Sequence, residues 1–146
     1  MPTSVIQAGP IGIRFLVEGT ESNGSVAVFE ALIPPNANMP VPHSHDGYEE
    51  TVYGLAGTSI WTVDGETTEV SAGDVICIRR GAVHGFDNRG ETDAKVLGVV
   101  TPGILGPDFF REVSAVFAEA AGGPPDFAKL GEVMRSHGLT PAPPAA

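Results

Sequence analysis

Two short segments hold three of the four histidines in this chain, and both place metal-binding side chains close together. The first segment runs from His43 and His45 to Glu49 and Glu50, and the second contains His84. Side chains two positions apart in an extended strand point to the same side, so His43 and His45 face one space. An Asp-Gly turn after His45 lets the chain return, which brings a carboxylate back toward the two imidazoles.

These residue types indicate metal-dependent chemistry. Neutral imidazoles and one carboxylate form a mixed nitrogen and oxygen site that suits Mn, Fe, Co, Ni, Cu or Zn. Three nitrogen ligands and one oxygen ligand leave open positions on a metal that accepts five or six ligands, so the site can bind a substrate as well as water. The sequence has no glycine-rich phosphate loop, Ser-His-Asp set or paired-cysteine motif that would indicate another reaction class.

The segments that position these residues look like short strands separated by Gly, Pro, Asp and Asn. The expected strands span residues 11–17, 25–33, 49–55, 58–63, 66–70, 75–79, 82–88 and 95–101. Asp64-Gly65 marks a tight hairpin turn within this run. About eight strands at this spacing predict an antiparallel sandwich or barrel, and the absence of a helical period before residue 107 argues against a βαβ fold.

The pattern changes after residue 106, where apolar residues begin to recur at helical spacing. The stripe comprises Phe109, Val113, Val116, Phe117 and Ala120. It predicts an amphipathic helix capped by Asp108, followed by a second short helix that begins at Asp126 and ends near His137, which caps it. We therefore expect a β-barrel over residues 1–106, a helical extension of the same domain over 107–140 and a disordered Pro- and Ala-rich tail over 141–146.

Composition and net charge argue against two classes of binding partner. A net charge of −10 argues against nucleic acid and against an anionic membrane surface. No apolar run approaches the ~20 residues of a membrane span, and the N-terminus shows no signal peptide. The single Cys77 cannot form an internal disulfide and lies in an apolar run, so we expect it to be buried and the protein to be cytoplasmic.

The two histidine segments resemble the two motifs of the cupin superfamily, G-x5-H-x-H-x3,4-E-x6-G and G-x5-P-x-G-x2-H-x3-N. The matching residues are His43, His45, Glu50 and Gly57 in the first motif, and Gly73, Gly81, His84 and Asn88 in the second. The spacing to Gly57 selects Glu50 over Glu49. Neither Asn36 nor Ala37 is the expected leading glycine, and Arg79 replaces the usual proline. These departures fall at turn positions and leave the ligand set intact.

The resemblance extends from residue 11 to about residue 140 and looks most like the small stand-alone cupins grouped with quercetin dioxygenases. It implies an all-β cupin jelly-roll barrel of antiparallel strands with short C-terminal α-helices, assembled as a homodimer. It also implies one divalent transition metal ion (Fe, Mn, Ni, Co, Cu or Zn) held by His43, His45, Glu50 and His84. Glu50 would serve as ligand and as catalytic base. The apolar stripe of the first helix needs a surface to cover, which favours the homodimer.

Strand alternation also predicts which residues line the substrate pocket. Phe86 and Asn88 fall on the side of His84, and Met39 and Val41 fall on the side of His43. The small-molecule substrate itself is not encoded in any motif, and three functions remain. One is a metal-dependent dioxygenase for a small aromatic or enolic substrate, the second a non-oxidative metal-dependent isomerase, cyclase or lyase, and the third a small-molecule-binding cupin without turnover. The fold alone does not choose among them.

Overall fold

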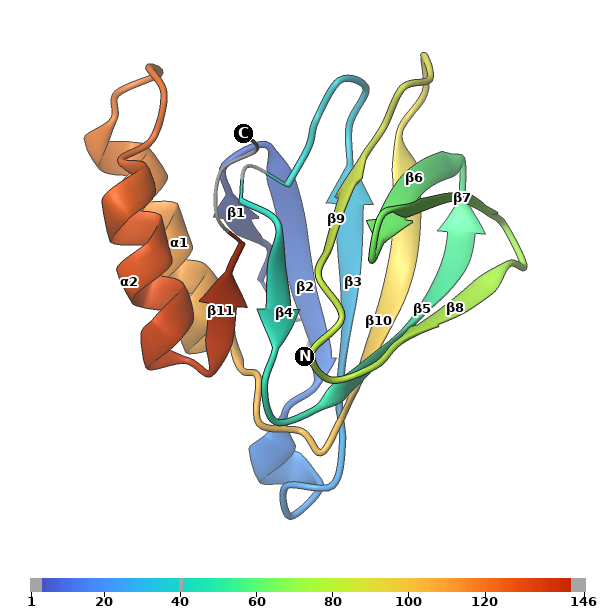
Figure 1. Ribbon diagram of the computed structural model, residues 1–146, viewed down its shortest axis with the longest axis horizontal. Helices are drawn as coiled ribbons and strands as arrows, with labels where there is room; N and C mark the ends of the chain where they lie inside the picture. The colour runs from blue at the N-terminus through green and yellow to red at the C-terminus, as the bar shows by residue number, and fades with distance from the viewer. Residues whose placement is uncertain (1–3, 40, 143–146) are drawn as a thin grey trace.

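Two antiparallel β-sheets face each other, and two helices pack beside one end of the sheets (Figure 1). The structure is a computed structural model that describes residues 4–39 and 41–142. One sheet has the strand order β1-β2-β3-β10-β5-β8, and the other has the order β11-β4-β9-β6-β7. The strands are β1 (Ile6–Ala8), β2 (Ile11–Val17), β3 (Ala27–Ile33), β4 (His43–His45), β5 (Glu49–Ala56), β6 (Thr58–Val63), β7 (Glu66–Ser71), β8 (Val75–Ile78), β9 (His84–Asp87), β10 (Ala94–Thr101) and β11 (Leu139–Pro141).

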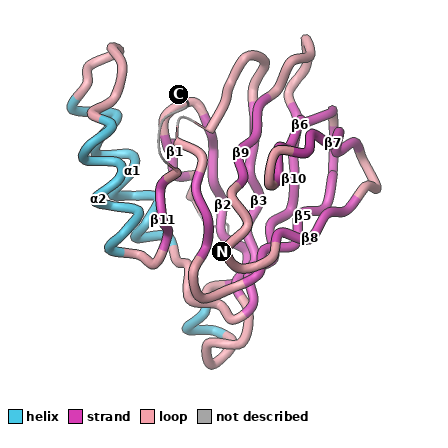
Figure 2. Tube along the Cα trace, viewed as in Figure 1, coloured by secondary structure: helices cyan, strands magenta, loops and turns pink. Residues whose placement is uncertain are grey.

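The chain crosses repeatedly between the two sheets (Figure 2). From β3 to β6 each strand joins the opposite sheet from its predecessor, and the same alternation recurs from β7 to β10. This connectivity is that of a jelly roll. The prediction of an all-β jelly roll with C-terminal helices is therefore confirmed, with the strands in two facing sheets rather than one closed ring.

The alternation of inward and outward side chains explains why these segments form strands around a core. In β10, Ala94, Val96, Gly98 and Val100 are buried, and the residues between them are more exposed. Gly98 makes room for the neighbouring strand, because a Cβ there would lie 2.7 Å from the ring of Phe29. The absence of a side chain at Gly98 therefore leaves room for the Phe29 ring in the core between the sheets.

The helices follow their sequence pattern closely. Helix α1 (Pro107–Glu119) begins with Pro107 after the N-cap Gly106, so Asp108 lies in the first turn instead of capping it. Asp126 caps α2 (Phe127–Ser136) by accepting hydrogen bonds from the Ala128 and Lys129 N–H groups. Neither helix is long and apolar enough to cross a membrane, within the part of the chain that the structure describes.

The apolar stripe of α1 is covered by the chain itself. Phe109, Phe110, Val113 and Val116 are buried, and α1 packs on β1 and α2. The stripe therefore gives no argument for a homodimer, contrary to the expectation from sequence.

Two other expectations differ from the structure. Cys77 is exposed, because it alternates with the buried Ile78 and so lies on the outer face of the six-stranded sheet. Pro141, expected in a disordered tail, belongs to β11, and the Ala142 N–H donates to the Pro42 carbonyl. The last four residues of that tail lie outside the described residues.

Candidate metal centre

Three buried histidines converge between the sheets. Strand β4 supplies His43 and His45, and β9 supplies His84, which lies opposite His43 in the register. The imidazole centroids are 5.1 Å apart for His43 and His45, 4.7 Å for His43 and His84, and 4.4 Å for His45 and His84. One nitrogen of each ring lies within 4.8 Å of the others, so these three residues could hold a metal ion.

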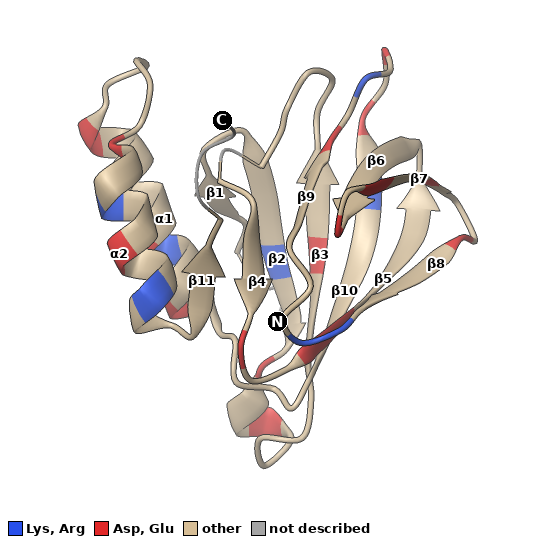
Figure 3. Ribbon diagram, viewed as in Figure 1, with Lys and Arg blue, Asp and Glu red and all other residues tan. Residues whose placement is uncertain are grey.

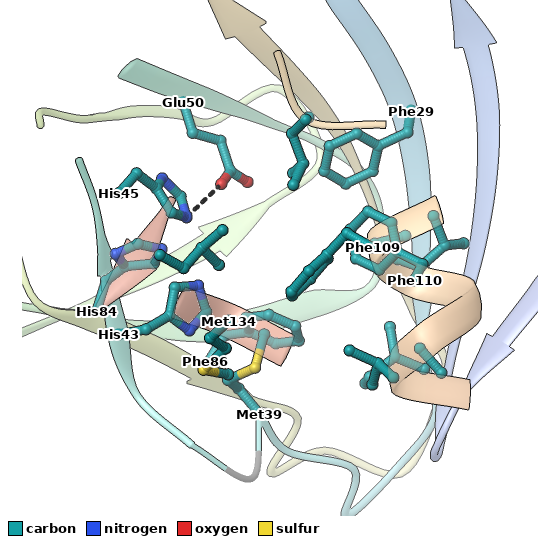
Figure 4. A pocket seen from close by; sticks show the side chains of 18 of the residues that line it. Phe29, Met39, His43, His45, Glu50, His84, Phe86, Phe109, Phe110 and Met134 are labelled. Carbon is teal, nitrogen blue, oxygen red and sulfur yellow. Dashed lines mark ion pairs between the residues drawn. The ribbon is translucent and has the colours of Figure 1, made fainter. Parts of the chain in front are cut away.

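Glu50 reaches this cluster from β5 in the opposite sheet (Figure 4). Its Oε1 atom lies 3.5 Å from Nε2 of His45, and the residue is buried. Two ligands bound about 2.1 Å from one ion are about 3–3.5 Å apart, so this spacing suits neighbouring ligands. Glu49 points the other way and pairs with Arg80, with Oε2 2.8 Å from Nε of the guanidinium.

Backbone carbonyls orient two of the imidazoles. Nδ1 of His43 lies 3.0 Å from the Val41 carbonyl, and Nδ1 of His84 lies 3.0 Å from the Ala82 carbonyl. A ring nitrogen that meets a carbonyl carries the proton, which leaves the Nε2 lone pair free for a metal. His45 is held differently, since its ring stacks on Tyr48 with centroids 4.4 Å apart.

The electrostatics of the cluster match what a cation requires. Burial lowers the pKa of His43 to about 3 and that of His45 to about 2, and it also lowers the pKa of His84. Burial raises the pKa of Glu50 to about 7, and no Lys or Arg of the described residues pairs with it. Neutral imidazoles are the form that binds metals, and a cation would compensate the buried carboxylate. The donor set therefore fits a divalent ion.

The four residues form the polar end of an apolar cavity of about 80 Å³. Both sheets and both helices contribute to its walls, which include Phe29, Trp61, Phe109, Phe110 and Met134. Figure 4 shows Phe109 and Phe110 across the cavity from the imidazoles. No Lys or Arg occurs among the described residues that line it, so the four polar side chains carry all of its polar chemistry.

Two of the four residues expected to line the pocket do so. Met39 and Phe86 face the cavity, and Phe86 stacks on Trp61 with centroids 4.6 Å apart. Val41 contributes its carbonyl to His43 instead.

Asn88 lies outside the cavity lining because its side chain holds the backbone together. Its Nδ2 donates to the carbonyls of Ile33 and Thr92, and its Oδ1 accepts from the Gly90 N–H. This motif residue therefore serves the fold rather than the pocket. Sequence reasoning did not predict that α1, α2 and Tyr48 lie at the site. The apolar stripe of α1 indicated only that this helix packs against another part of the structure.

The fold and the site together define a jelly-roll protein with a buried three-histidine cluster that could bind a metal. The chain belongs to the cupin family. The family model of the cupin domain matches residues 29–100. The oxalate-binding protein of Thermotoga maritima is 32% identical over 93 residues, which cover 63% of this chain and 76% of the relative.

Solved structures give the same fold. A predicted oxalate decarboxylase from Thermotoga maritima has a TM-score of 0.61 at 25% identity, covering 64% of this chain and 82% of that chain. A putative ethanolamine utilization protein from Salmonella typhimurium has a TM-score of 0.54 at 26% identity, covering 67% and 74%. The segment matched by the family model ends before α1, so the helices that close the cavity lie beyond it.

Proposed function

We propose that this protein is a metal-dependent dioxygenase for a small enolic substrate. The observation that carries the proposal is the Glu50 carboxylate, which lies beside three neutral imidazoles and faces an apolar cavity of about 80 Å³. A cavity of about 150 Å³ holds benzene, so this space suits a substrate of only a few heavy atoms. Size therefore favours a small enol over the flavonols of quercetin dioxygenases.

Each residue of the site has a distinct task in this proposal. A divalent ion of the group Fe, Mn, Ni, Co, Cu or Zn, held by His43, His45, Glu50 and His84, would supply Lewis acidity and, where redox-active, a centre for O2 chemistry. Glu50 accepts the proton of the enol hydroxyl, because its carboxylate faces the cavity beside the imidazoles. The apolar walls exclude water and favour apolar O2.

Oxalate is the second candidate, favoured by the names of two relatives, the oxalate-binding protein and the predicted oxalate decarboxylase of Thermotoga maritima. The cavity lining weighs against it. Oxalate carries two carboxylates, and the described lining residues offer no Lys or Arg for the one that lies away from the metal. Burying an unpaired carboxylate is costly, so we expect weaker binding of oxalate than of a neutral enol.

An oxygen electrode tests these alternatives on metal-reconstituted protein. We expect O2 consumption with malondialdehyde, a dicarbonyl that enolises and is smaller than benzene. This consumption should be lost in Glu50→Gln but not in Glu49→Gln, whose side chain is half-buried and pairs with Arg80. CO2 release from oxalate, with no O2 uptake in the presence of malondialdehyde, would favour the oxalate reaction. Conversion of malondialdehyde without O2 uptake would indicate a non-oxidative isomerase, cyclase or lyase. Binding of malondialdehyde without any turnover would indicate a binding protein, and each of these outcomes contradicts the dioxygenase.

A homodimer that acts on a small molecule belongs to the same proposal. The net charge of −10 supports a protein that binds neither nucleic acid nor an anionic membrane. The single cysteine fits a reducing compartment, which supports a cytoplasmic location.

A further inference from the structure

The cavity beside the metal centre is enclosed on almost every side. Of the described residues that line it, only Met39, Phe86 and Phe117 are not buried. The Phe117 ring packs against the turn between β1 and β2, since a Cβ at Gly9 would lie 2.6 Å from it. Met39 and Phe86 therefore mark the place where the cavity comes nearest to solvent.

A second hollow meets the cavity at this place. It has a volume of about 380 Å³ and lies on the outer face of the five-stranded sheet, because Thr62 and Gly85 line it and alternate with residues that line the cavity. Met39, His84 and Phe86 line both spaces, so they form the partition between the hollow and the cavity. Figure 4 shows Met39 and Phe86 on the side of the imidazoles opposite Glu50.

Phe86 and His84 are the fixed parts of this partition. The Phe86 ring stacks on Trp61 with centroids 4.6 Å apart, and Nε1 of Trp61 donates to the buried Ser59 hydroxyl at 2.9 Å. The imidazole of His84 is held by the Ala82 carbonyl, which lies 3.0 Å from its Nδ1. Neither ring can turn aside without the loss of these contacts.

Met39 is the movable part of the partition. Its N–H donates to the Phe86 carbonyl at 2.8 Å, which holds its backbone beside β9. Its side chain is half-exposed, and an unbranched thioether with three rotatable bonds changes rotamer readily. Displacement of this one side chain would join the hollow to the cavity, whereas displacement of Phe86 would break its stack on Trp61.

The charge of the hollow suits a neutral molecule. None of the described residues that line it is Lys or Arg, and its one carboxylate, that of Asp87, already has a cationic partner. Figure 3 shows no Lys, Arg, Asp or Glu on β4, the strand that carries His43 and His45. An anion such as oxalate would lose its hydration on this route without gaining a cationic partner, which a neutral molecule avoids.

We propose that small neutral molecules reach the metal centre between Met39 and Phe86, and that the Met39 side chain sets the size of the molecule that passes. Entry is restricted to the fraction of time in which Met39 is displaced, so truncation of this side chain removes that restriction. Met39 is thus a specificity-determining residue that takes no part in the chemistry. The proposal rests on the proposed function only for the identity of the substrate, because the same route exists in the metal-free protein.

Fluorescence quenching of Trp61 in the metal-free full chain tests this route. Trp61 is the single tryptophan of the chain, lines the cavity and is 3% exposed. The probe is acrylamide, a neutral quencher of indole fluorescence with as many heavy atoms as malondialdehyde. We expect Met39→Ala to raise the bimolecular quenching constant about 5-fold or more, and Met39→Phe, which fills the gap with a larger and stiffer side chain, to lower it below that of the wild type. Iodide should gain less than acrylamide from Met39→Ala, and an equal gain would contradict the preference for neutral molecules.

Met134→Ala and Phe117→Ala are the matched controls. Met134→Ala removes the same atoms from the same cavity, but Met134 is buried on α2 and does not line the hollow. Phe117→Ala truncates the other lining side chain that is not buried. Neither should change the quenching constant. A gain in either control equal to that of Met39→Ala, or an unchanged constant in Met39→Ala, would overturn the route.

Thermal unfolding checks that each variant is folded, and Met39→Phe decides the question if Met39→Ala is not. The quenching measurement requires neither metal nor turnover, so its outcome is separate from that of the oxygen-electrode experiment. The expected quenching in a protein that consumes no O2 would remove the dioxygenase and leave the route standing. O2 consumption with equal quenching in Met39→Ala and the wild type would remove the route alone.

Discussion

Leu139 of β11 lies directly opposite His45 of β4 in the five-stranded sheet. The same junction includes a hydrogen bond from the Asp46 N–H to the Gly138 carbonyl and one from the Thr140 hydroxyl to the Asp46 carboxylate. The strand that carries two of the candidate ligands is thus held by the C-terminal segment, which also supplies the helical walls of the cavity. Closure of the cavity and placement of the histidines depend on the same contacts.

Leu139→Ala should therefore weaken metal binding as well as stability. Leu139 is 1% exposed, and its truncation should cost about 2–4 kcal/mol of unfolding free energy. Loss of its packing should also loosen β4, so we expect Co²⁺ affinity to fall about 10-fold or more. Isothermal titration of the metal and thermal unfolding measure the two effects.

Leu130→Ala provides the matched control for this variant. Leu130 is equally buried and lines the same cavity, but it lies on α2 and has no partner in β4. It should show a similar loss of stability with nearly unchanged Co²⁺ affinity. Equal affinity losses in both variants would mean that general destabilisation, and not the β11–β4 junction, explains the effect.

His84→Ala distinguishes a reaction centre from a structural metal. His84 comes from a different strand than His43 and His45, so its removal leaves the local pair in place. We expect turnover of the enolic substrate to fall by about 10² or more even when metal is resupplied, because the ligand geometry is lost. Arg89→Ala is the control, since Arg89 follows the same strand but is exposed and pairs with Asp87 outside the cavity lining. Undiminished activity of His84→Ala would rule out the metal-centred mechanism.

Much of this arrangement could be predicted from local sequence patterns. The strands β2 and β6 have the predicted bounds, because alternation and turn residues define them without reference to distant partners. Motif spacing also predicted that Glu50, and not Glu49, points inward. The strand bounds rest on periods of two and on turns, which depend on neighbouring residues alone, whereas the choice of Glu50 rests on the resemblance to the cupin motif.

The features that sequence reasoning missed depend on long-range packing. The three-residue strand β11 carries too short a pattern to be recognised, and it exists because β4 offers an unpaired edge. The stripe of α1 predicted an amphipathic helix but not the surface that it covers. Cys77 lies in an apolar run that resembles a buried strand, and it is exposed because it alternates with the buried Ile78 and so lies on the outer face of the sheet.

Chelation should lower the melting temperature and leave the β-structure intact. Buried apolar residues outside the cavity lining, including Val52, Val70, Ile78 and Val100, pack between the sheets and require no metal to do so. A metal at 100 times its Kd stabilises the folded state by about 2.7 kcal/mol, which chelation would remove. Thermal unfolding followed by circular dichroism, with and without a chelator, measures the shift. Unfolding of the chelated protein at room temperature would contradict this division between the core and the site.

The metal-free protein should lose stability as pH falls below 6.5. His43 and His45 have folded-state pKa values of about 3 and about 2 against 6.5 when unfolded, so their contribution is full above pH 6.5 and is lost as pH falls toward those values. Each should cost about 2 kcal/mol of unfolding free energy between pH 6.5 and pH 5. Urea unfolding across this pH range measures the total loss of unfolding free energy.

Titration of Glu50 should partly offset this loss of unfolding free energy, so a Glu50 variant tests the origin of the pH dependence. Its folded-state pKa of about 7 exceeds the ordinary 4.5, so its contribution to stability is full below pH 4.5 and is lost as pH rises through 7. Acidification from pH 7 to pH 5 therefore protonates Glu50 and removes the free-energy cost of its buried charge. Over the same interval the cost of keeping the two buried histidines neutral rises. Glu50→Gln removes that relief, so the metal-free variant should lose stability more steeply than the wild type over the same interval. Glu30, which pairs with Arg14 and Lys95, does not affect this comparison. Its pKa is lowered, so these ion pairs are lost only below pH 4.5. Parallel pH profiles for the two proteins would show that Glu50 titrates normally in the folded state.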